Sequence, residues 1–117
     1  NACADKPIWI ARRFKDGSYE AQYGKDVENN IYLAPKASHS YLPPPGVSLP
    51  SMVFWPQMDC DSAGAHCKLG GVGGPNQSEC PSFGCAPDVN TLFEVSFSTS
   101  LSQDNWDVSV VDGYTLP

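Results

Sequence analysis

Alternation of apolar and polar side chains is clearest in the C-terminal stretch from Thr91 to Pro117. On each side of a polar break at 102–105, the apolar positions share one parity: Phe93, Val95 and Phe97, then Trp106, Val108 and Val110. Because successive strand residues face opposite sides of a sheet, this pattern predicts a β-hairpin with an apolar face and an acid-bearing face. Trp106 is expected in the core.

Shorter apolar runs predict further strands at 7–11, 28–33 and 51–55, with Pro56 ending the last one or marking a sheet edge. Between them, 34–50 is rich in proline and 59–90 is rich in turn residues, so both are expected to be loops. No sustained 3.6-residue period is present. The chain of 117 residues is therefore expected to be one all-β domain, in the form of a sandwich.

Composition narrows the classes of function. The net charge is −6, and a nucleic-acid backbone requires clustered Lys and Arg, so no nucleic-acid partner is expected. Six of the seven basic residues lie in 1–36, whereas eight of the thirteen acids lie in 37–117. The acidic part is either a solvated surface or a functional patch. No apolar run is long enough to span a membrane.

The chain contains five cysteines: Cys3, Cys60, Cys67, Cys80 and Cys85. A zinc site would be the alternative to disulfides, but there is no CxxC pair, and His66 adjoins Cys67 instead of standing at a ligand spacing. We therefore expect a disulfide framework and no metal or cofactor. Asn76 begins an N-glycosylation sequon, which agrees with a secreted protein whose leader has been removed.

Several motifs occur in the order typical of one family. They are Asn1-x-Cys3 with Ile8-Trp9, Phe54-Trp55, Asp59-Cys60, Gly64 to Cys67, Gly73-Gly74, Cys80, Thr91-Leu92-Phe93-Glu94, and Asp107 to Pro117 (DVSVVDGYTLP). Together they resemble the thaumatin-like proteins, the pathogenesis-related osmotin and thaumatin type. The C-terminal segment is the most specific match, and the resemblance is strongest over 53–117. It implies a flattened antiparallel β-sandwich with disulfide-linked loops.

The chain departs from the family pattern in three ways. A strand before the first cysteine and a cysteine-rich region after Pro117 are both expected in the family and absent, so 1–117 resembles a truncated or processed single domain. Cys3 thereby loses its family partner and is expected to be unpaired or bonded to a second chain. Val72 replaces a cysteine and Cys85 is extra. The family's cleft arginine would fall near Val47 and is missing.

The resemblance also implies disulfide pairing and a ligand. It predicts a Cys60–Cys67 disulfide, and proximity and parity then predict Cys80–Cys85. Family members carry an acidic cleft associated with binding of β-1,3-glucan, antifungal action and, in some, weak endo-β-1,3-glucanase activity. The matching cleft acids are Glu94, Asp107 and Asp112. A sugar site also needs an aromatic platform, for which Tyr114 and Trp106 are the candidates, with Trp106 expected in the core instead.

Spacing separates the three acids. Glycoside hydrolysis needs two carboxyl groups about 5–5.5 Å or about 6.5–9.5 Å apart, and Asp107 and Asp112 would lie about 17 Å apart along one strand. If the hairpin turns at 102–105, Glu94 faces Asp112 or Gly113. We therefore predict Glu94 as general acid and Asp112 as the residue that positions water, with Asp107 binding hydroxyls. Alternatively, Asp112-Gly113 is simply a turn.

These observations favour a secreted protein of the extracellular space or cell wall that binds cell-wall polysaccharide, β-1,3-glucan by resemblance, in antifungal defence or wall remodelling. One alternative is a weak endo-β-1,3-glucanase acting through Glu94 and Asp112. Another is a protein-interaction, adhesion or enzyme-inhibitor module that uses the acidic surface or the Pro43–Pro45 tract.

Overall fold

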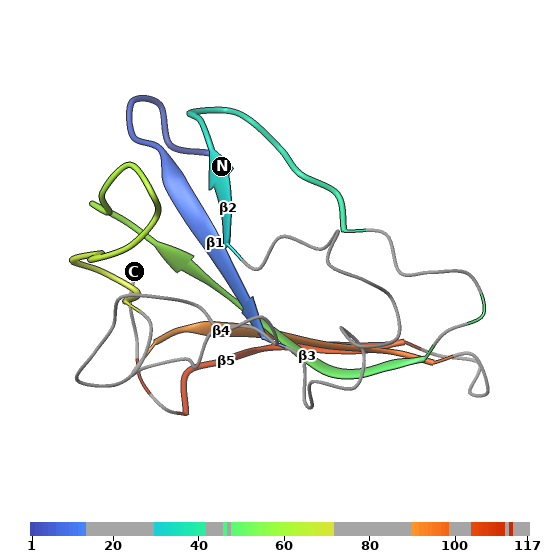
Figure 1. Cartoon of the computed structure of the whole chain (residues 1–117). Helices are drawn as coiled ribbons and strands as arrows, with labels where there is room; N and C mark the ends of the chain where they lie inside the picture. Colours follow the sequence, from blue (N-terminus) through green and yellow to red (C-terminus); the bar gives the residue numbers. More distant parts are fainter. Residues whose placement is uncertain are drawn as a thin grey trace.

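The described part of the chain forms one antiparallel sheet of five strands. The structure, a computed structural model, describes residues 1–13, 30–41, 46, 48–71, 90–98, 104–111 and 113. The strands are β1 (Ile8–Arg13), β2 (Asn30–Leu33), β3 (Leu49–Gln57), β4 (Leu92–Phe97) and β5 (Asn105–Ser109), in the sheet order β2-β1-β3-β4-β5 (Figure 1). The predicted all-β antiparallel fold is confirmed. The described part of the chain contains no helix that could cross a membrane.

Strand β3 is the centre of this sheet and is longer than the sequence predicts. Its second half pairs with β1, from Arg13↔Val53 to Trp9↔Gln57, while its first half pairs with β4. Of the two predicted alternatives, Pro56 does not end the strand, because β3 continues to Gln57, but it does mark a local edge of the sheet. The ladder with β4 stops at Phe54↔Phe93, so Pro56 borders β1 alone. At such a local edge a missing N–H is tolerated.

A bulge in β3 changes the course of the sheet. Leu49 pairs with Phe97 and Met52 pairs with Val95, so β3 has one more residue than β4 between these two pairs. Ser51, within the bulge, has a φ of 54°. The Ser51 N–H, displaced from the regular ladder, donates to Ser96 Oγ at 2.8 Å. Bulges increase the local twist of a sheet. Figure 1 shows the β1–β2 end turned steeply away from the β4–β5 end.

Buried apolar side chains lie on both faces of β3 and β4. One cluster contains Ala11, Trp55 and Leu92, and the other contains Leu49, Met52, Phe54 and Val95. Trp55 is 1% exposed, and its indole Nε1 donates to the Gly70 carbonyl at 3.1 Å. The hairpin face that the sequence marks as acid-bearing is therefore partly core, because Leu92 is buried there.

The outer strand β5 is not core. Trp106 is 68% exposed, and Val108 and Val110 on the same face are 60% and 58% exposed. The prediction of a buried Trp106 is therefore wrong. Among the described strands β5 lies at the edge of the sheet, and no other described strand packs over this face.

A loop between Met58 and Leu69 closes against the end of β3. Met58 and Leu69 form an antiparallel bridge, and the predicted Cys60–Cys67 disulfide is present inside the loop. In the chain-entropy model a crosslink over so short a loop stabilises the fold by about 2–3 kcal/mol.

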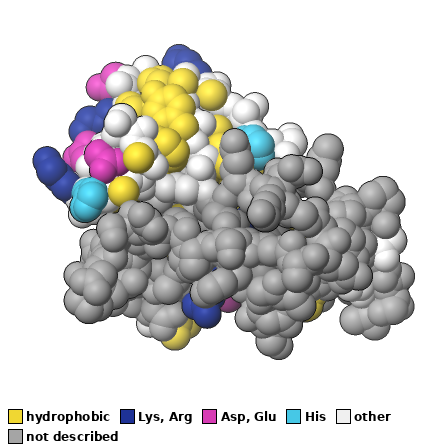
Figure 2. Space-filling view, viewed as in Figure 1, with side chains coloured by type: hydrophobic (Ala, Val, Ile, Leu, Met, Phe, Trp, Pro, Cys, Tyr) yellow, Lys and Arg dark blue, Asp and Glu magenta, His cyan; other side chains and the backbone are white. Residues whose placement is uncertain are grey.

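Figure 2 shows charged side chains beside an apolar patch at the β1–β2 end, where Trp9 and Tyr32 pack edge to face at 5.3 Å.

Gly70 is expected to be indispensable for this closure. Its φ is +67°, and a Cβ there would lie 1.9 Å from the Pro56 carbonyl oxygen. Gly46 has a similar φ of +77°, but a Cβ there would have no atom within 4 Å. Gly46→Ala therefore has the cost of a positive φ without a steric clash. Gly70→Ala should reduce the free energy of unfolding by about 2 kcal/mol more than Gly46→Ala does, measured by urea denaturation. Equal effects would contradict this packing.

Candidate functional site

Two carboxylates face each other across the β4–β5 ladder. The register pairs Glu94 with Asp107, flanked by Leu92↔Ser109 and Ser96↔Asn105. The prediction that Glu94 lies opposite Asp112 or Gly113 is therefore wrong. The reason is the position of the turn. β4 ends at Phe97 and β5 begins at Asn105, so the connection spans 98–104. Its centre lies earlier than that of 102–105, which shifts the register.

Several predicted residues lie outside the described residues. They are Asp112, Tyr114, Asn76 and the Cys80–Cys85 pair. Their roles remain predictions, including Asp112 as the residue that positions water. The position opposite Glu94 is nevertheless occupied by Asp107, so Asp107 is the acid that the sheet brings next to Glu94.

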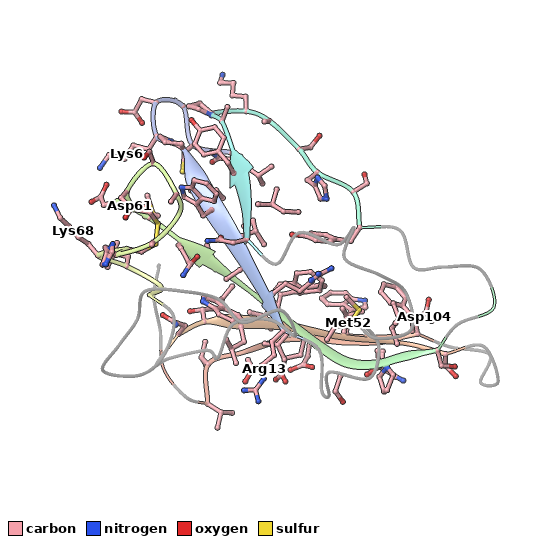
Figure 3. All side chains as sticks on the ribbon, viewed as in Figure 1. Lys6, Arg13, Met52, Asp61, Lys68 and Asp104 are labelled. Atoms are coloured by element: carbon pink, nitrogen blue, oxygen red, sulfur yellow. A yellow bond between two sulfur atoms is a disulfide. The ribbon has the colours of Figure 1, made fainter. Side chains whose placement is uncertain are left out.

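The Glu94–Asp107 pair continues as a row across the sheet. Val53 on β3 is opposite Glu94, and Arg13 on β1 is opposite Val53. Directly opposed residues of antiparallel strands project to the same face. Figure 3 shows Arg13 and Met52 on opposite sides of the ribbon. The row therefore lies on the face away from the cluster that contains Met52.

The geometry of the pair suits binding of hydroxyl groups. Opposed residues have Cβ atoms about 4.5–5.5 Å apart, and like charges at that spacing destabilise a sheet. Glu94 is half-buried and Asp107 is exposed. Ionised carboxylates are acceptors only, and together the pair presents four oxygens to hydroxyl donors. The described residues hold no group of three His, Cys, Asp or Glu side chains that could bind a metal ion.

An apolar groove occupies the opposite face of the sheet. Its volume is about 440 Å³, and its lining includes Phe54, Phe93 and Val108. Aromatic rings continue across it, with centroids 6.3 Å apart for Phe54 and Phe93 and 6.1 Å apart for Phe93 and Trp106. The alternating pattern of the hairpin predicts that this face is apolar. It does not predict that the face forms an exposed groove.

In the disulfide loop, the carboxylate of Asp61 forms three hydrogen bonds. Asp61 Oδ1 accepts hydrogen bonds from the Ala63 and Ala65 N–H groups, both at 2.9 Å, and Oδ2 lies 2.8 Å from His66 Nδ1. The hydrogen bond with His66, followed by that from Ala65, lowers the pKa of Asp61 below its ordinary value of 3.8. Figure 3 shows Asp61 and Lys68 together at this end and Arg13 beneath the sheet.

Cys3 is free and exposed. The chain around it is fixed by Asn1, whose terminal amine donates to the Ala37 carbonyl at 2.9 Å and whose side-chain amide donates to the Leu33 carbonyl at 3.0 Å. Asn1 Oδ1 in turn accepts from the Cys3 N–H at 3.0 Å. A second chain bonded through Cys3 stays a prediction.

Comparison with known proteins decides the family. The sequence model of the thaumatin family matches residues 1–117. The chain belongs to the thaumatin family. The five-stranded antiparallel sheet and the Cys60–Cys67 disulfide are consistent with that family's β fold.

The relatives carry thaumatin-like and osmotin-like names. The chain is 35% identical over 77 residues to osmotin-like protein OSML15 of Solanum commersonii, and 38% identical over 87 residues to thaumatin-like protein 1b of Malus domestica. These matches cover 63% and 73% of this family member. They span only 28% and 39% of the relatives' lengths. No solved structure matches the chain significantly.

The Asp61 contacts predict a specific dependence of stability on pH. Because the folded-state pKa of Asp61 is lowered, the ionised group stabilises the fold above pH 3.8, and this contribution is lost as the pH falls through the folded-state pKa. Asp61→Asn should therefore flatten the acid limb of stability below about pH 4, measured by urea unfolding at stepped pH. Asp59→Asn, an exposed neighbour, is the control. If the stability of Asp61→Asn falls with decreasing pH as steeply as that of the wild type, the predicted role of Asp61 is wrong.

Proposed function

We propose that this thaumatin family member is a secreted protein that binds cell-wall polysaccharide, β-1,3-glucan in particular, through the face bearing Glu94 and Asp107. The observation that carries the proposal is the direct cross-strand pairing of these two acids. Each sugar ring offers several hydroxyl donors, and hydrogen bonds to ionised acceptors are stronger than those between neutral groups. Family membership supports a polysaccharide ligand and an antifungal or wall-remodelling role.

Removing either carboxylate should weaken binding. Glu94→Gln and Asp107→Asn keep the shape of each side chain but replace a charged acceptor by a neutral amide. A hydrogen bond to a charged group contributes about 1.5–3 kcal/mol, so each change should lower the affinity for soluble β-1,3-glucan by tenfold or more. Isothermal titration calorimetry with laminarin measures this effect.

The matched control is Asp5→Asn. Asp5 is exposed and lies outside the sheet, so this change removes one negative charge without touching the pair. Its affinity should equal that of the wild type. Wild-type protein that binds neither laminarin nor insoluble glucan would overturn the proposal and favour a role in protein interaction.

A second candidate function is weak endo-β-1,3-glucanase activity. The register favours Asp107 over Asp112 as the partner of Glu94, since a cross-strand pair has the short separation that paired carboxyl catalysis requires. In that case Glu94 acts as general acid and Asp107 as the second carboxylate.

Hydrolysis is tested by reducing sugar released from laminarin. If the second function is correct, Glu94→Gln and Asp107→Asn should each lower the rate by at least about a hundredfold, because general acid–base catalysis contributes about 10²–10⁴-fold. Asp112→Asn compares the two candidate partners directly. Binding without release of reducing sugar in the wild type would exclude the enzyme and leave the binding function in place.

A further inference from the structure

The cross-strand row that holds the two acids also holds a cation. Arg13, Val53, Glu94 and Asp107 come from β1, β3, β4 and β5, in that order. Each is directly opposite the next, so all four side chains project to one face. A basic end, an apolar middle and an acidic end thus form one strip across four strands.

The strip is too long for one sugar ring to reach both ends. Neighbouring strands are about 4.7–4.9 Å apart, so three strand spacings separate Arg13 from Asp107 by about 14 Å between backbones. Val53 between the charged groups is half-buried and has no side-chain hydrogen-bonding group. The one ion pair within the described part of the chain joins His66 and Asp61, so Arg13 and Glu94 do not neutralise each other directly.

The chemistry of the two ends is complementary. Arg13 is half-buried and carries five N–H donors on a rigid, permanently charged fork. Glu94 and Asp107 are acceptors when ionised. A neutral polyhydroxylated chain has both ring oxygens that accept and hydroxyls that donate, so one extended chain satisfies both ends. A divalent cation would be attracted to the acidic end and repelled at the other.

We propose that Arg13 is a further ligand-binding residue, which donates to the same saccharide chain that Glu94 and Asp107 bind and thereby selects extended oligosaccharides over short ones. This inference rests on the proposed binding of glucan. It assigns the donor end of the site to β1, a strand that sequence motifs connect with no ligand.

The test is affinity as a function of ligand length. Wild type, Arg13→Gln and Arg13→Lys are titrated with β-1,3-linked glucose oligomers of increasing length. Arg13→Gln should bind the longest oligomers about tenfold more weakly than wild type and the shortest equally well. Arg13→Lys keeps the charge and three donors and should recover most of the loss. Lys6→Gln is the charge control, because Lys6 is exposed and far from Arg13 (Figure 3).

The outcomes separate this inference from the function on which it rests. A loss confined to long oligomers supports Arg13 as a binding residue. Equal affinities of wild type and Arg13→Gln at every length overturn the inference but leave glucan binding standing. A uniform loss at every length also overturns it, since that is the signature of a structural role. Wild type that binds no oligomer overturns both.

Discussion

The register of β3 is the constraint on which the described structure depends. One strand supplies both ladders that join the β1–β2 and β4–β5 parts of the sheet, so its alignment sets which residues of four strands share a row. Side chains alternate with a period of two, and a slip by one residue would move Val53 to the other face and separate Arg13 from Glu94. The bulge between Leu49 and Met52 confines the irregularity to one end of the strand.

Local pattern was enough to find the strands but not to align them. The runs at 7–11, 28–33 and 51–55 and the hairpin all become strands, because β-branched and aromatic residues fit a pleated surface. In the sequence, the polar residues 102–105 mark the turn of the hairpin. Asn105 nevertheless belongs to β5. Polar residues occur in exposed edge strands as well as in loops. Polarity therefore does not locate the ends of the turn, and without them the register between β4 and β5 does not follow from the sequence.

The same limit explains the error at Trp106. Alternation shows which side chains share a face, yet it does not show which face is covered. Leu92 shares a face with Glu94 and is 4% exposed, because it belongs to a buried cluster with Trp55 from β3 and Ala11 from β1. Trp106 lies on the face that alternation marks as apolar and stays 68% exposed. Coverage depends on contacts between strands distant in sequence, and a single strand's pattern does not contain them.

The placement of Glu94 opposite Asp107 is electrostatically unfavourable for the sheet. Opposed like charges destabilise a sheet by a few tenths of a kcal/mol or more, whereas a neutral pair such as Thr and Thr would stabilise it. Within the row of described residues no cation adjoins the two acids, because Val53 occupies the next position and Arg13 stands two strands from Glu94. A ligand rich in hydroxyl donors would offset it by binding both carboxylates at once. The repulsion thus favours a recognition site over a structural contact, and it predicts that Glu94→Gln stabilises the free protein while weakening the complex. Thermal unfolding with and without laminarin would separate these two effects, and a Glu94→Gln protein less stable than wild type in the absence of ligand would show that the pair is structural.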